Sequence, residues 1–107
     1  MPVRHIVMFG VKEDTSEEQM AALKEGLLAL PGKIDVIKSH QWGLDLKLPS
    51  GQNHPGGKNR TVMWSADFDD AEAFEVYAAH ADHVAVINTC IKPIMEPGTR
   101  AAIQYAL

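Results

Sequence analysis

The stretch Tyr77-Ala78-Ala79-His80-Ala81-Asp82-His83 lies where two short helical patterns meet. Imidazole is the side chain most easily poised to move protons near neutral pH. A histidine at the N-terminus of a helix tends to stay neutral, because the positive end of the helix dipole disfavours imidazolium. A neutral imidazole can act as a general base. From the spacing alone, however, two ordinary surface or packing histidines are the better interpretation.

The segments on either side of this stretch predict helices. Upstream, Asp69-Asp70 can cap a helix that runs through Ala79, with Tyr77 on its apolar side. Downstream, His80 opens a further helix, and Pro93 bends or ends it. An apolar stripe at helical spacing marks this second helix, and it consists of Val84, Ile87, Ile91 and Ile94.

Another helix is predicted nearer the N-terminus. Thr15 and Glu18 have the spacing of a capping box, and Pro31-Gly32 is expected to stop the helix. The apolar stripe between these signals is formed by Met20, Leu23, Leu27 and Leu30. We expect this stripe to pack in the core.

Alternating hydrophobicity predicts four strands, at residues 3–11, 34–44, 60–68 and 99–107. Gly43 can mark a bulge in the second strand. In the first strand, one face is formed by Val3, His5, Val7, Phe9 and Val11, and the other by Arg4, Ile6 and Met8. Because both faces are largely apolar, both are expected to be covered.

Residues 47–59 are turn formers with almost no apolar content. This long connection is either a lid or a plain strand-to-strand loop, and the plain loop is the better prediction.

The predicted order is β-α-β-β-α-β, with the second helix broken in two. This order is the split βαβ arrangement of an α+β, ferredoxin-like fold. The crossover rule places the helices on one face of an antiparallel sheet. The other, apolar face is then bare, so we expect a second copy of the chain to cover it and form a barrel-like homodimer.

Length and composition are those of one domain, residues 1–107. With a formal net charge of -4 and no basic stripe, nucleic acid and anionic membranes are poor partners. The single cysteine, Cys90, excludes an intrachain disulfide and a thiolate zinc site. The chain lacks a signal-peptide pattern and any apolar run near the ~20 residues that span a bilayer, so we predict a cytoplasmic protein.

Neither a metal nor a cofactor is expected. His80 and His83 share a helix face, but zinc needs three or four ligands. The chain also has no glycine-rich phosphate-binding loop.

Three segments carry a resemblance to a known family. Val3–Phe9 looks like an opening strand with its histidine, and Glu72–Tyr77 followed by His80–Val84 looks like a "Y…HPxHv" signature. Trp42-Gly43-Leu44-Asp45 is similar to an aromatic-Gly-x-Asp stretch of plant members. Together these segments resemble the dimeric α/β-barrel family (Dabb, stress-responsive A/B barrel) over nearly the whole chain.

The resemblance implies a homodimeric barrel, and in some members a cofactor-free polyketide cyclase that binds its substrate between sheet and helices. It implies His83 as a general base and Tyr77 as its helper. The positions that it implies for binding an apolar small molecule are His5, Val7, Val62, Trp64 and His80.

The chain also departs from the cyclase pattern, with Ala81 for a proline, Val62 for a polar residue, Leu27 for a tyrosine and Gln104-Tyr105 for an Asp-aromatic pair. Three function classes therefore stay open. The first is a cofactor-independent cyclase or lyase acting on a carbonyl-bearing, polyketide-like molecule. The second is a non-catalytic, stress-associated ligand-binding dimer, and the third is a cofactor-free monooxygenase. A cavity that reaches His83, with Tyr77 pointing into it, favours an enzyme.

Overall fold

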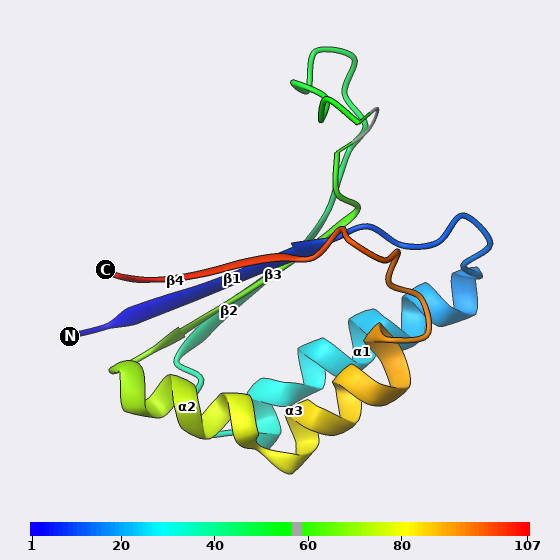
Figure 1. Cartoon of the computed structure of the whole chain (residues 1–107). Coiled ribbons are helices and arrows are strands. Elements are labelled where there is room, and N and C mark those ends of the chain that lie inside the picture. Colours follow the sequence, from blue (N-terminus) through cyan, green and yellow to red (C-terminus); the bar gives the residue numbers. More distant parts are fainter. Residues whose placement is uncertain (57–58) are drawn as a thin grey trace.

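A computed structural model describes residues 1–56 and 59–107 and has the predicted β-α-β-β-α-β order (Figure 1). Its strands are β1 (Val3–Phe9), β2 (Ser39–Leu44), β3 (Val62–Phe68) and β4 (Ala101–Ala106). Its helices are α1 (Glu17–Lys33), α2 (Ala71–Ala79) and α3 (Ala81–Val86), and α3 runs on into a π-helical turn, η1 (Ile87–Ile91). None of the helices in the described part of the chain is long and apolar enough to cross a membrane.

The four strands form one antiparallel sheet in the order β2-β3-β1-β4, which is the ferredoxin-like arrangement. In the centre of the sheet, Val7 of β1 pairs with Trp64 of β3 on one side and with Ala102 of β4 on the other. All helices lie on one face of the sheet (Figure 1). The predicted fold is confirmed.

The core lies between the sheet and α1, as the two hydrophobic periods predict. Alternate residues of β1 and β3 meet the predicted stripe of α1, and the largest buried side chains include Phe9, Trp64, Phe68, Leu23, Leu27 and Leu30. Complete burial of such a side chain contributes about 1.5–3 kcal/mol. This face of the sheet therefore holds most of the stabilising contacts.

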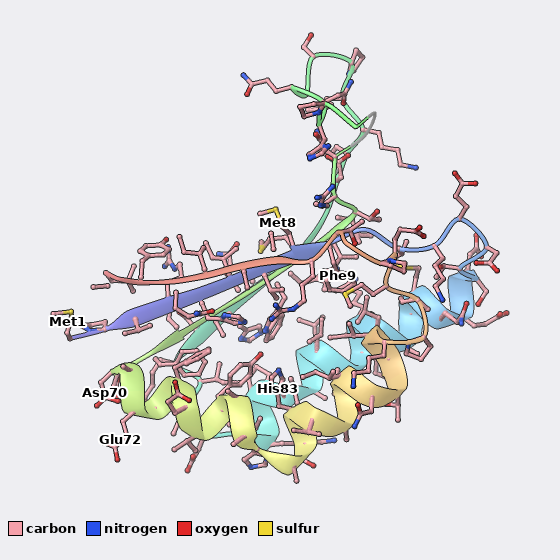
Figure 2. All side chains as sticks on the ribbon, in the orientation of Figure 1. Met1, Met8, Phe9, Asp70, Glu72 and His83 are labelled. Carbon is pink, nitrogen blue, oxygen red and sulfur yellow. The ribbon has the colours of Figure 1, made fainter. Side chains whose placement is uncertain are left out.

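The opposite face of the sheet carries exposed apolar side chains in the single chain, beside the Arg4–Asp67 ion pair. Figure 2 shows Met8 and Phe9, which are neighbours in β1, on opposite sides of the sheet. Met8 is 39% exposed, and on β4 Ile103 and Tyr105 are 57% and 40% exposed. These residues form the outer face, which the first-strand pattern predicted to be apolar.

Two details of α1 differ from prediction. The capping box consists of Ser16 and Gln19, one residue later than the predicted Thr15 and Glu18: Ser16 Oγ accepts from the Gln19 N–H, and Gln19 Oε1 accepts from the Ser16 N–H. The helix also does not stop at Pro31 but runs to Lys33. Pro31 lies in the last turn, where its missing N–H removes a single helical hydrogen bond.

The second strand begins at Ser39 and not at residue 34 as predicted. Ile34 and Ile37 are both buried, which a strand would not allow because residues three apart face opposite sides. A turn brings both into the core, since the Ile37 N–H donates to the Ile34 carbonyl at 3.2 Å. The predicted bulge at Gly43 is also absent, because Gly43 pairs with Met63 in a continuous register.

The predicted stripe of the last helix is broken at its first member, because Val84 is 41% exposed while Ile94 is buried. The described part of the connection between β2 and β3, residues 45–56 and 59–61, rises from the sheet on the side away from the helices (Figure 1). The prediction of a loop or lid at 47–59 includes residues 57 and 58, which lie outside the described residues.

Candidate functional site

A cavity of about 520 Å³ lies between the sheet and the helices. Five residues predicted for the site line it: His5, Val7, Trp64, Tyr77 and His83. They come from β1, β3, α2 and α3, so the cavity exists only because the fold brings these elements together. The remaining walls are mostly apolar, from Phe9, Leu27, Phe74, Ile87, Ile91 and Met95 among others.

The break between α2 and α3 brings His83 back onto Tyr77. His80 has an extended backbone (φ -65°, ψ 136°) that ends α2 and caps α3, with its Nδ1 accepting from the Asp82 N–H at 3.1 Å. The break therefore forms with Ala81 in place of a proline. As a result the Tyr77 and His83 rings stack, with centroids 4.1 Å apart. The sequence alone could not show whether Tyr77 reaches His83.

Hydrogen bonding fixes the tautomer of His83. Its Nδ1 lies 3.1 Å from the carbonyl oxygen of Ala78, and because a carbonyl can only accept, Nδ1 carries the hydrogen. The Nε2 atom then keeps its lone pair. Burial lowers the pKa of His83 below its ordinary value, which favours the neutral ring. Figure 2 places His83 between the helices and the sheet, where a base would meet a ligand.

Tyr77 is held as a hydrogen-bond donor. The buried Trp64 Nε1–H donates to the Tyr77 hydroxyl oxygen at 3.1 Å. Burial raises the pKa of Tyr77 to about 12, so the hydroxyl keeps its proton at neutral pH. The indole thus orients the oxygen, and the phenolic hydrogen is left for another acceptor.

A second neutral histidine stands in the same cavity. His5 Nδ1 donates to Gln104 Oε1 at 2.7 Å, and the two residues are register partners on β1 and β4. Burial lowers the pKa of His5, and the nearby His83 lowers it further. Sequence reasoning treated Gln104 only as a departure from the family pattern. The signal that could have found it is its position opposite His5 once the strands are paired.

Two predicted binding residues do not line the cavity. Val62 is buried at the far end of β3, beside Phe9 in the sheet register. His80 is used in capping α3. Conversely, Phe74 lines the cavity, together with two cations that sequence reasoning did not place there, Lys92 and Arg100.

Within residues 1–56 and 59–107, no three His, Cys, Asp or Glu side chains group in a way that could hold a metal ion. The absence of a metal and of a cofactor stays a prediction.

Comparison with protein families gives a match to the model described as "Stress responsive A/B Barrel Domain" (Dabb), over residues 3–106. Among curated proteins, the chain is 30% identical over 83 residues to the stress-response A/B barrel domain-containing protein HS1 of Arabidopsis thaliana. That alignment covers 78% of this chain and 72% of the relative.

Solved structures give the same fold. A dimeric ferredoxin-like protein from Thermobifida fusca is 31% identical, with a TM-score of 0.81 over 100% of this chain and 92% of that one. A dimeric ferredoxin-like protein from Bacteroides fragilis is 30% identical, with a TM-score of 0.76 over 99% and 96% of the two chains. The hydroxynitrile lyase of Passiflora edulis has a TM-score of 0.83 over 99% and 93%, but at 21% identity it is similar in fold alone.

Proposed function

The chain belongs to the stress-responsive A/B barrel domain (Dabb) family, and from this premise we propose that it is a homodimeric small-molecule-binding barrel with cofactor-free cyclase or lyase activity. The observation that carries the proposal is the His83–Tyr77 pair in the cavity. The pair offers a neutral base and a protonated donor to the same ligand.

The proposed chemistry is proton abstraction next to a carbonyl. His83 Nε2 takes the proton from the carbon alpha to the carbonyl, and the electron pair of that C–H bond moves to form an enolate. The Tyr77 hydroxyl donates a hydrogen bond to the oxygen on which charge develops. The enolate carbon can then attack a second carbonyl, whose oxygen takes the proton back from His83. Alternatively, the enolate expels a leaving group from its β-carbon, and that group departs with the proton. A positioned general base typically contributes 10²–10⁴-fold to such a step.

The homodimer is supported by the outer face and by two relatives. Exposed apolar side chains gathered on one face of a sheet are typical of an interaction surface, and here they include Met8, Ile103 and Tyr105. The relatives from Thermobifida fusca and Bacteroides fragilis are described as dimeric. A second copy packed by its own outer face would cover this surface about a two-fold axis.

The test needs no knowledge of the natural substrate. Propiophenone, a neutral aryl ketone with enolisable hydrogens, is incubated with the protein in D₂O, and loss of its α-hydrogen signal is followed by NMR. We expect exchange above the buffer rate, and we expect His83→Gln to remove it. His54→Gln is the matched control, because His54 lies on the exposed β2–β3 connection and not in the cavity.

The same experiment separates the non-catalytic alternative. Chemical-shift changes in propiophenone report binding whether or not exchange occurs. Binding without exchange, unchanged in His83→Gln, would refute the enzyme and leave a ligand-binding barrel.

A further inference from the structure

One end of the cavity carries positive charge. Arg100 lies one residue before β4, in phase with Ala102 and Gln104, whose side chains line the cavity. This alternation places Arg100 on the inner face of the sheet. Lys92 follows η1 and lines the cavity from the helical side. The two cations therefore approach the same space from opposite layers.

Within residues 1–56 and 59–107, no acidic side chain neutralises these charges. Among the described residues that line the cavity there is no aspartate or glutamate. Neither Arg100 nor Lys92 forms an ion pair with any residue in the described part of the chain. The charge of Arg100 also acts on the polar centre: it adds to the lowering of the pKa of His5 and His83 and partly offsets the effect of burial on the pKa of Tyr77.

We propose that the ligand of this cavity is an anion, an apolar carbonyl compound whose carboxylate is bound by Arg100 with help from Lys92. This inference rests on the proposed function and adds the substrate class to it. The planar guanidinium matches a carboxylate in a bidentate geometry that a lysine does not offer. Arg100 is thus the specificity-determining residue, while His83 takes the proton next to the carbonyl and Tyr77 donates to the carbonyl oxygen.

The spacing sets the shape of the ligand. Four residues of extended chain separate Gln104, which lies at the histidine pair, from Arg100, and this corresponds to roughly 13 Å between their Cα atoms. The arginine side chain reaches back over part of this length. A carbonyl and a carboxylate separated by a short aliphatic chain would therefore span the two sites, with an aryl or alkyl end in the apolar part of the cavity.

The test compares two probes of the same shape, γ-benzoylbutyrate and its primary amide, by isothermal titration calorimetry. For the native protein we expect the carboxylate to bind roughly tenfold more tightly than the amide, because a charge-assisted hydrogen bond replaces a neutral one. Arg100→Gln should abolish this preference and leave amide binding unchanged. Lys92→Gln should reduce the preference. Arg60→Gln, which changes an arginine that does not line the cavity, should retain it.

Added salt provides a second measurement. In the native protein, higher ionic strength should weaken carboxylate binding and leave amide binding nearly constant. Equal affinity for the two probes, or an unchanged preference in Arg100→Gln, would overturn the inference. So would a failure of the carboxylate probe to bind. Propiophenone has no carboxylate for Arg100 to bind, so its hydrogen exchange tests the proposed function separately.

Discussion

The buried hydrogen bond between Trp64 and Tyr77 should contribute a measurable part of the free energy of unfolding. Both side chains are 1% exposed, and the indole N–H donates to the phenolic oxygen. Tyr77→Phe removes the acceptor and leaves the indole N–H buried without a partner. An unsatisfied buried donor costs about 1–3 kcal/mol, and because the cavity beside it can admit water, we expect the lower half, about 1–2 kcal/mol.

The assay is denaturant unfolding at fixed protein concentration, since a dimer is stabilised by mass action. In thermal unfolding the same loss should lower the melting temperature by about 4–8 °C for each kcal/mol. Val76→Ala is the control, because Val76 precedes Tyr77 in α2, is 50% exposed and lies away from the outer face of the sheet. Its effect should stay within about 0.5 kcal/mol.

A double-mutant cycle isolates the pair. In a Trp64→Phe background the indole donor is gone, so Tyr77→Phe should cost about 1 kcal/mol less than it does in the native protein. Strictly additive losses, or a Tyr77→Phe protein as stable as the parent, would refute the claim that the indole positions the hydroxyl. The role of Tyr77 as an oriented donor would then lose its structural basis.

Three further predictions concern other parts of the molecule. Ile103→Lys places a charge on the outer face, so in sedimentation it should convert a dimer of twice 11.7 kDa into a monomer. A native protein that sediments as a monomer would refute the proposed dimer. Because burial lowers the folded-state pKa of His83 below 6.5, the unfolded chain binds the proton more readily. The contribution of His83 to stability should therefore be fully present above about pH 7 and be lost toward about pH 5. The melting temperature of His83→Gln should vary less across that range, and an equally steep pH profile would contradict this. His80→Ala removes the cap of α3 and should cost about 1 kcal/mol in denaturant unfolding, whereas His80→Asn should keep most of the stability because asparagine also caps; equal losses would argue against the cap.

Which faces of the strands are buried could be predicted because the period of two is a direct consequence of the pleat. Val62, Trp64, Ala66 and Phe68 alternate along the strand predicted at residues 60–68, and all are buried. The cap of α1 could not be chosen in the same way. Thr15 with Glu18 and Ser16 with Gln19 have equivalent spacing, and the choice depends on a turn in which the Thr15 N–H donates to the Lys12 carbonyl.

The candidate site was predictable only in part. Tyr77 and His83 are close in sequence, and the helical break between them could be identified from the residues alone. Arg100 and Gln104 enter the cavity through the pairing of β4 with β1, a contact between the two ends of the chain. No local pattern marks such a contact, because it is fixed only when the sheet closes.

The π-helical turn η1 makes the size of the cavity depend on chain length as well as on residue type. In η1 the Lys92 N–H donates to the Ile87 carbonyl, five residues back, so this turn holds one residue more than an α-helix does. Deleting a single residue there would let α3 continue as an α-helix and would leave Lys92 and Met95 facing nearly the same way, because the π-helical turn absorbs the extra residue locally. Insertions and deletions of one residue at this turn are thus a route by which a barrel of this fold could reshape the wall formed by Ile87 and Ile91 while its sheet and the residues after the turn keep their places.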